Sequence, residues 1–236
     1  NVEGGRDVSG AELRALYDAV VLAIGSPLDR PLGVRGEEKM GVYGASVFVG
    51  WYNGHPDFHD LWPRLRTPTA VVIGNGNVAL DVARVLLKSR DELAASDVPE
   101  DVADALASSG IRQVHLVGRR GAKDSKFSLA ELREMAELGD CDLVLDPNDL
   151  PPGHSAEAEE RGQETRALRI LREFASTGRR GRRKRLDFRF NLAPREILGG
   201  PSAEAVRFER TRVEAGQLVG TGELVTLPCG LVVSAI

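Results

Sequence analysis

A strand, a glycine-rich turn and a helix follow one another between residues 69 and 87, and this order constrains the fold more than any other feature. The five residues TAVVI are apolar and largely β-branched, which is typical of a buried strand. After the turn GNGNVA, apolar side chains at Val78, Val82, Val85 and Leu86 recur at the spacing of a helix that packs on a sheet. The segment therefore predicts a doubly wound, Rossmann-like α/β fold with a parallel sheet.

The turn itself predicts a dinucleotide site. Gly74 and Gly76 leave room for backbone amides to approach a pyrophosphate, and Ala79 is small enough for the helix to pack against the strand. The helix N-terminus adds free N–H groups and about half a positive charge. A tight strand-to-helix turn that binds nothing is the alternative, because a G-x-G-x-x-A pattern alone is a weak signal.

Two arginines follow the next predicted strand, QVHLV at residues 113–117. An NAD-binding fold places an acidic residue there for the ribose 2′-hydroxyl, whereas this chain has Arg119 and Arg120 after Gly118. Guanidinium groups match a phosphate, and each charge-assisted hydrogen bond contributes on the order of 1.5 to 3 kcal/mol. We therefore expect NADP rather than NAD, with arginines that merely face water as the alternative.

Composition excludes several classes of function. The chain has 236 residues, 42% of them hydrophobic and 28% charged, which describes an ordinary soluble protein of one large or two small domains. A net charge of −4 argues against nucleic acid as a partner. No apolar run approaches the ~20 residues of a membrane span. Cys141 and Cys229 form no C-x-x-C motif and indicate no disulfide framework, so a cytoplasmic or other reducing compartment is expected.

Further elements are expected on both sides of the glycine turn. They are a strand at Tyr17–Gly25, an aromatic turn at Val47–Gly54, a helix at Asp101–Ser108, a helix at Leu129–Leu138, a solvent-facing helix at Ala156–Ala175, antiparallel strands at Leu186–Leu192, Ala205–Val213 and Leu224–Leu227, and a final strand within Gly230–Ile236 that returns to the parallel sheet. Ser128 and Glu131 form the pattern of a capping box before the second helix.

Other polar groups carry weaker signals. His55, Asp57, His59 and Asp60 lie in a proline-containing loop and are interpreted as polar surface, so we expect no metal site. The basic run at residues 179–185 is interpreted as a solvated loop, with a docking patch for an acidic protein as the alternative. The sequence indicates no catalytic residue, and redox chemistry would be that of a cofactor.

Several stretches, taken together and in order, resemble the adrenodoxin reductase type of ferredoxin-NADP reductase, a flavoprotein family. They are Tyr17–Gly25, GWYNGHP at 50–56, VIGNGNVALDVAR at 72–84, VGRRG at 117–121, ELREM at 131–135 and LPCGLV at 227–232. The resemblance implies a hydride transfer from NADP(H) to FAD, followed by reduction of an iron-sulfur ferredoxin.

The resemblance also implies roles for particular residues. Asn75, Gly76, Asn77 and Val78 would hold the pyrophosphate, and Arg119 and Arg120 the 2′-phosphate. Glu131 would join the NADP site, and Arg133 would dock an acidic ferredoxin.

The chain departs from the family in two respects. Residues 122–127 are more charged than the family's usual apolar stretch, and the family's N-terminal FAD fingerprint and C-terminal flavin-contacting segment are absent. We therefore expect residues 1–66 to be the end of an FAD domain with a crossover linker, and residues 67–236 to be a truncated NADP-binding domain. On this interpretation FAD is bound mainly by segments absent from the chain, which binds NADPH weakly and is inactive alone.

Two other functions stay open. The small subunit of glutamate synthase and its relatives also carry two arginines after the second strand, although the GWYNG and ELREM segments favour the first family. A non-catalytic NADP sensor or scaffold would keep the fold without a flavin. The compartment would be the cytoplasm, or the mitochondrial matrix in a eukaryote.

Overall fold

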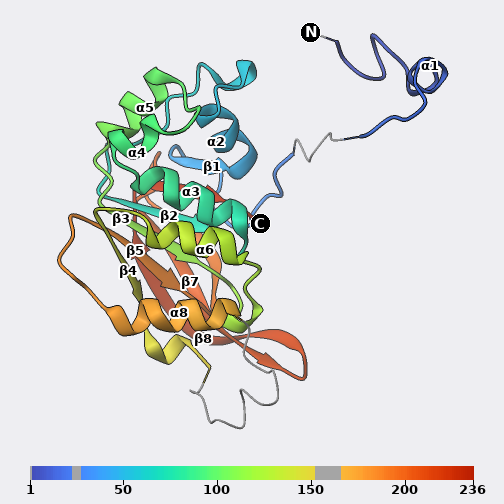
Figure 1. The fold of residues 1–236 in the computed structure, drawn as a ribbon. Helices are drawn as coiled ribbons and strands as arrows, with labels where there is room; N and C mark the ends of the chain where they lie inside the picture. The colour runs from blue at the N-terminus through green and yellow to red at the C-terminus, as the bar shows by residue number, and fades with distance from the viewer. Residues whose placement is uncertain (1, 23–27, 152–165) are drawn as a thin grey trace.

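The computed structural model describes residues 2–22, 28–151 and 166–236, and a six-stranded parallel sheet forms its centre (Figure 1). The strand order is β1-β9-β2-β3-β5-β4. The strands are β1 (Val42–Gly44), β9 (Leu231–Ser234), β2 (Thr69–Ile73), β3 (Gln113–Val117), β5 (Lys184–Arg189) and β4 (Cys141–Leu145).

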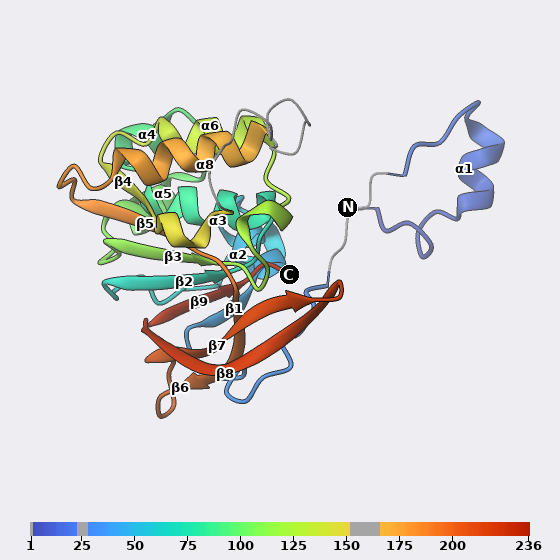
Figure 2. The ribbon, with the colours of Figure 1, turned by 90° about the horizontal axis from the view of Figure 1, so that it is seen from below.

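The helices from α2 onward cover one face of this sheet, and a three-stranded antiparallel sheet covers the other, whereas α1 lies apart from both sheets (Figure 2). The α-helices are α1 (Gly10–Leu16), α2 (Ala45–Tyr52), α3 (Asn77–Leu87), α4 (Arg90–Ala94), α5 (Glu100–Ala107), α6 (Leu129–Ala136) and α8 (Arg166–Thr177). The antiparallel strands are β6 (Leu192–Leu198), β7 (Ala205–Glu214) and β8 (Gln217–Pro228), and the short 3₁₀ helices are η1 (Pro56–Phe58), η2 (Ala122–Asp124) and η3 (Pro147–Asp149).

The continuous apolar runs of the central strands follow from this layering. In β2, Ala70 and Val72 belong to the core beneath the helices, whereas Val71 and Ile73 belong to the core shared with the antiparallel sheet. A strand buried on both faces needs apolar residues at every position rather than at alternate ones. The predicted α/β fold with an antiparallel extension is therefore confirmed, and so is the return of β9 to the parallel sheet between β1 and β2.

Two predictions near the N-terminus are wrong. Residues 17–22 form no strand, and residues 23–25 lie outside the described residues. Val21 is 88% exposed, and no described segment pairs with it. Residues 47–52 are part of helix α2, not of a turn. The glycine that weakens the helical pattern, Gly50, is needed because a Cβ there would lie 2.3 Å from the Phe58 ring.

The segment Leu186–Leu192 was expected to be an antiparallel strand, and this expectation is also wrong. Most of it is β5, which pairs in parallel with both β3 and β4. Its alternating pattern arises because Leu186 and Phe188 face the helices while Asp187 faces the opposite side, where it accepts a hydrogen bond from Arg185. An ionic group on one face thus imitates the pattern of a half-exposed strand.

Helix α8 differs from the solvent-facing helix expected at Ala156–Ala175. Its Leu168, Leu171 and Phe174 are buried, so α8 is amphipathic and packs on the sheet. Residues 156–165 lie outside the described residues. The division at residue 66 stays a prediction; β1 and α2, which precede it, pack with the strands and helices that follow it. None of the described helices is long and apolar enough to cross a membrane.

Candidate functional site

The glycine turn between β2 and α3 is closely packed on one side and open on the other. A Cβ at Gly74 would lie 2.4 Å from the Ala235 carbonyl oxygen and 3.0 Å from the Ala79 Cβ, so only glycine fits. A Cβ at Gly76 would meet nothing within 4 Å, and no side chain caps α3 at this position. The open side therefore presents the helix N-terminus to an anion.

Asn75 lies between this turn and the loop that follows β3. Its side-chain amide is buried, and neither its oxygen nor its nitrogen has a hydrogen-bond partner in the described part of the chain. A Cβ at Gly118 would lie 2.8 Å from Asn75 Cγ, so Gly118 is required for this approach. Because buried amides are nearly always hydrogen-bonded, the unpaired amide fits a missing ligand at this edge of the sheet.

Asn77 and Val78, at the start of α3, differ in what their side chains do. The Asn77 Oδ1 accepts a hydrogen bond of 2.8 Å from the Ser128 N–H, which links α3 to the start of α6. The Val78 side chain is 49% exposed on the open side. Asn77 therefore has a structural role whether or not its backbone contacts a pyrophosphate.

Arg119 and Arg120 lie beside the turn because β2 and β3 are neighbouring parallel strands that end in register, Ile73 opposite Val117. Arg119 is exposed and Arg120 is half-buried. Neither guanidinium group has an ion pair or hydrogen bond within residues 2–22, 28–151 and 166–236. The structure thus brings together the predicted pyrophosphate residues and two unpaired cations, as a 2′-phosphorylated dinucleotide requires.

Glu131 does not complete the capping box that its sequence position suggests. Ser128 accepts a hydrogen bond from the Glu131 N–H, but the Ser128 N–H donates to Asn77 and leaves the Glu131 carboxylate free to turn elsewhere. It lies 3.6 Å from the Arg84 guanidinium. The cap is therefore one-sided, and Glu131 faces α3.

Arg84 is a feature that sequence reasoning missed. On α3 it forms ion pairs with Asp81 and Glu134 in addition to Glu131, and its side chain is mostly buried. Burial raises the pKa of the neighbouring Tyr52 hydroxyl, and Asp81 adds to the effect. In the sequence, only the helical spacing between Asp81 and Arg84 could have indicated this cluster. The other members come from different helices, Tyr52 from α2 and the two glutamates from α6.

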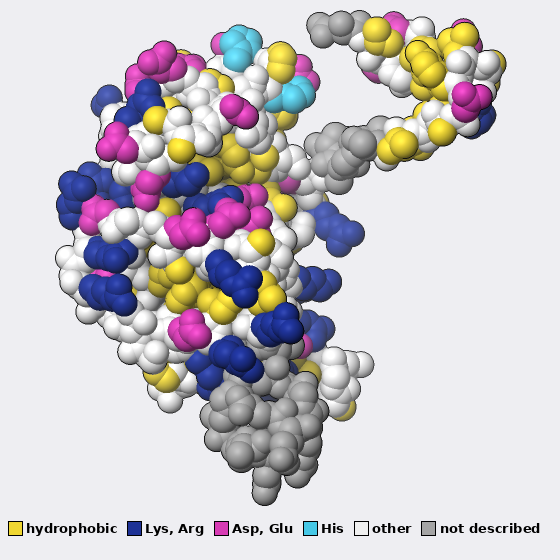
Figure 3. All heavy atoms as spheres, viewed as in Figure 1, with side chains coloured by type: hydrophobic (Ala, Val, Ile, Leu, Met, Phe, Trp, Pro, Cys, Tyr) yellow, Lys and Arg dark blue, Asp and Glu magenta, His cyan; other side chains and the backbone are white. Residues whose placement is uncertain are grey.

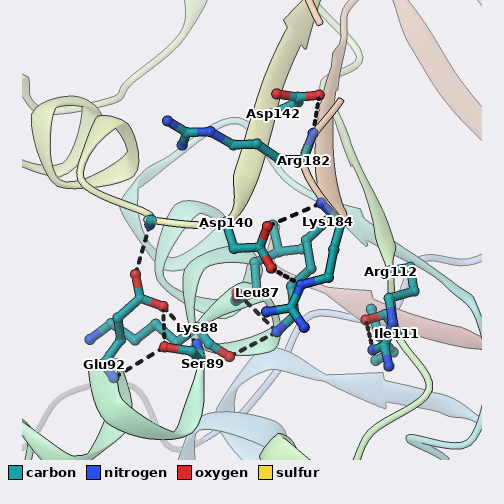
Figure 4. A network of polar contacts seen from close by, with 12 residues as sticks. Leu87, Lys88, Ser89, Glu92, Ile111, Arg112, Asp140, Asp142, Arg182 and Lys184 are labelled. Atoms are coloured by element: carbon teal, nitrogen blue, oxygen red, sulfur yellow. Dashed lines mark hydrogen bonds and ion pairs between the residues drawn. The ribbon is translucent and has the colours of Figure 1, made fainter. Parts of the chain in front are cut away.

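The basic run at residues 179–185 is largely part of the structure rather than a free loop. The Asp142 carboxylate accepts hydrogen bonds from the backbone N–H groups of Arg180, Gly181 and Arg182, at 2.9 to 3.2 Å. Figure 4 shows the one from Arg182. Three converging N–H groups hold this buried carboxylate and order the loop.

Lys184 and Arg183 also have partners at this end of the sheet. The Lys184 ammonium donates to the carbonyl oxygens of Leu87 and Lys88, at the C-terminus of α3 (Figure 4). Arg183 forms an ion pair with Asp140. These contacts lie at the amino ends of the strands, opposite the glycine turn, so this run does not contribute to the candidate site.

Other candidate groups do not form a site. The exposed His55 and His59 lie 3.9 and 3.1 Å from the carboxylates of their neighbours Asp57 and Asp60, and their other polar contacts are with the backbone of the same loop. No cluster of three metal-ligating side chains occurs among the described residues. Cys141 and Cys229 are buried free thiols, and burial raises the pKa of each to about 12.

The layered sheet and the strand, glycine turn and helix define the class of the protein as a Rossmann-like α/β domain with the FAD/NAD(P)-binding type of fold. No protein-family model matches the chain. It is 40% identical, over its whole length, to 53% of the NADPH-ferredoxin reductase FprA of Mycobacterium tuberculosis H37Rv and to 51% of the mitochondrial NADPH:adrenodoxin oxidoreductase of Bos taurus. The structure of M. tuberculosis FprA in complex with NADPH is similar with a TM-score of 0.89 at 40% identity, over the whole chain and 53% of FprA.

These comparisons confirm the resemblance to the adrenodoxin reductase type of reductase. The chain is a homologue of part of these enzymes, and it spans about half the length of the curated relatives it matches.

Proposed function

We propose that the chain is the NADP(H)-binding part of a flavin-dependent ferredoxin-NADP⁺ reductase. The observation that carries this proposal is that Arg119 and Arg120 lie beside an open glycine turn with guanidinium groups that have no partner among the described residues. Bound NADPH is a hydride donor, which in such an enzyme reduces FAD, and the electrons then pass to an iron-sulfur ferredoxin. On this proposal FAD is held mainly by segments outside the chain.

The residues of the chain bind and orient the dinucleotide. The start of α3 and the turn around Gly76 hold the pyrophosphate through backbone N–H groups, and the buried Asn75 amide gains the partner that it lacks in the described part of the chain. Arg119 and Arg120 bind the 2′-phosphate and so select NADP over NAD. Glu131 joins the site as a hydrogen-bond acceptor whose carboxylate is held by Arg84.

We further propose that an acidic ferredoxin docks near Arg133. Arg133 is exposed on α6, and no partner for its guanidinium occurs among the described residues. Acidic side chains gather over α3 and α6, with basic side chains around them (Figure 3), so docking would depend on local rather than overall charge. The protein would act in a reducing compartment, the cytoplasm or, in a eukaryote, the mitochondrial matrix.

Titration of the chain with NADP⁺ and NAD⁺ tests the cofactor assignment. We expect NADP⁺ to bind more tightly, and Arg120→Ala to weaken NADP⁺ by about tenfold or more, since one charge-assisted hydrogen bond contributes about 1.5 kcal/mol or more. NAD⁺ binding should not change. Arg179→Ala is the matched control, because Arg179 is an exposed arginine at the opposite end of the strands. Equal affinity for both dinucleotides would contradict the assignment.

A spectroscopic experiment tests the reductase itself. In the longer protein that contains this chain, we expect NADPH to bleach a flavin absorbance band more readily than NADH does. The chain alone should reduce neither a ferredoxin nor a dye. A longer protein without any flavin band would instead favour the non-catalytic sensor.

A further inference from the structure

The loop that carries the two arginines is held by a neighbouring part of the chain through three successive carbonyl groups. The Gly118 oxygen accepts a hydrogen bond of 3.1 Å from the Leu192 N–H, and the Arg120 oxygen accepts one of 3.3 Å from the Asn191 N–H. Between them, the Arg119 oxygen accepts a hydrogen bond of 2.7 Å from the Thr211 hydroxyl. Among the described residues, this hydroxyl is the only side-chain group that contacts the loop's carbonyls.

Thr211 is placed for this contact by an irregularity of the antiparallel sheet. It lies in β7 where the pairing with β8 shifts between Glu209 and Thr211, as in a β-bulge, and its side chain is directed toward the parallel sheet. Thr211 is only 5% exposed. A buried hydroxyl therefore has one specific acceptor, the backbone of an arginine at the site.

The same residue also fixes the turn on the other side of the loop. The Thr211 N–H donates to the Asn191 oxygen at 2.8 Å. Asn191 has a left-handed backbone (φ 58°), which lets the chain turn from β5 into β6 and directs its N–H to Arg120. Thr211, Asn191 and the arginine loop thus form one hydrogen-bonded unit, which we call the brace.

We propose that Thr211 is a positioning residue that sets the preference for a 2′-phosphorylated dinucleotide. This inference rests on the proposed function. The guanidinium groups of Arg119 and Arg120 have no partners among the described residues, so the backbone beneath them determines how much order must be gained on binding. The brace supplies that order in advance. Because the proposed function assigns these arginines to the 2′-phosphate, which NAD⁺ lacks, loss of the brace should weaken the binding of NADP⁺ and leave the binding of NAD⁺ unaffected.

The test compares three threonine variants of the chain by titration with NADP⁺ and NAD⁺. Thr211→Val removes the hydroxyl at nearly constant volume, and Thr211→Ser keeps it. We expect T211V to bind NADP⁺ roughly three- to tenfold more weakly, as for the loss of one neutral hydrogen bond, with NAD⁺ unchanged and T211S close to the unaltered chain. Thr221→Val is the matched control, because the Thr221 hydroxyl donates to the Arg210 carbonyl within the same sheet, at 3.0 Å.

The outcomes separate this inference from the function on which it rests. If the unaltered chain binds NADP⁺ and NAD⁺ equally, the proposed function fails. If the chain prefers NADP⁺ and R120A abolishes the preference, but T211V keeps the unaltered ratio of affinities, only the role of Thr211 is refuted. The role of Thr211 is also refuted if T211V loses affinity equally for both dinucleotides, or if T221V shows the same change in the ratio of affinities as T211V. A merely structural role would produce either result.

A measurement on the unaltered chain does not depend on any variant folding. The Asn191 amide, which donates to the Arg120 carbonyl, should exchange its hydrogen more slowly when a bound 2′-phosphate further restricts opening of the arginine loop. We expect 2′,5′-ADP to slow this exchange more than 5′-AMP does. Equal slowing by the two nucleotides would contradict a link between the brace and the 2′-phosphate.

Discussion

Replacement of Gly76 by alanine should separate dinucleotide binding from stability. The backbone of Gly76 is extended (φ −135°, ψ −179°), and the added Cβ would meet nothing within 4 Å. Alanine restricts the unfolded chain, which stabilises by about 0.4 to 1 kcal/mol, but it is a poorer N-cap than glycine by several tenths. These contributions nearly cancel, and we expect the free energy of unfolding to change by less than about 0.5 kcal/mol.

Binding should respond much more strongly than stability. The methyl group would occupy the space through which a pyrophosphate approaches the N–H groups at the start of α3. Loss of one charge-assisted hydrogen bond costs about 1.5 to 3 kcal/mol, which corresponds to roughly 10- to 100-fold weaker binding. Isothermal titration with NADP⁺, together with urea unfolding, measures both quantities on the same protein.

Two other glycines provide the controls. Gly74→Ala would place its Cβ 2.4 Å from the Ala235 oxygen and should lose stability, by about 1 to 3 kcal/mol, as well as binding. Gly200→Ala, in an exposed turn with nothing within 4 Å of the added Cβ, should change neither. If Gly76→Ala binds NADP⁺ as tightly as the unaltered chain, the pyrophosphate does not lie on this turn and the reasoning is refuted.

Three further predictions concern stability away from the turn. Lys184→Met removes two hydrogen bonds to the end of α3 and should lower the free energy of unfolding in urea by about 1 to 3 kcal/mol. The affinity for NADP⁺ should not change, and a weaker affinity would contradict the separation between the two ends of the sheet. Leu171→Ala, in the buried face of α8, should cost about 2 to 5 kcal/mol, and a cost below about 1 would show that α8 is not packed as described. Burial lowers the pKa of His115, whose Nδ1 lies 3.5 Å from the Asp187 carboxylate without a hydrogen bond to it. The folded protein therefore favours neutral His115, and this contribution to stability is present above about pH 6.5 and is lost as the pH falls. Unfolding measured between about pH 7 and 5 should therefore be less pH-dependent for His115→Gln than for the unaltered chain, and equal slopes would refute this.

The parts of the fold that were predicted correctly are those whose determinants are local in the sequence. The strand, turn and helix around Gly74 and Gly76 are specified within about 20 residues, and the carboxyl-end position of Arg119 follows from the strand before it. Segments such as Leu186–Leu192 were misassigned because their pattern depends on partners far away: Asp187 is buried beside His115 of β3. Periodicity reports which positions are apolar and cannot show that a polar position is buried with a partner.

The candidate site shows the same division between local and distant determinants. The sequence indicated Arg119, Arg120 and the glycines of the turn, but it did not indicate the residues that hold the arginine loop in place. Thr211 is 92 residues from Arg119 in the chain, and a lone threonine in a strand carries no signal of its acceptor.

The hydrogen bond between Asn77 and Ser128 has consequences for the whole edge of the sheet. By taking the Ser128 N–H, Asn77 makes the helix cap one-sided and leaves Glu131 to pair with Arg84. The glycine turn and the acidic cluster are therefore not independent. A change at Asn77 should alter the position of Glu131 as well as the turn, so its effect on NADP⁺ binding should not be additive with that of Glu131. A double-mutant cycle of Asn77→Ala and Glu131→Gln measures this coupling, and strict additivity would show that the carboxylate is placed by α6 alone.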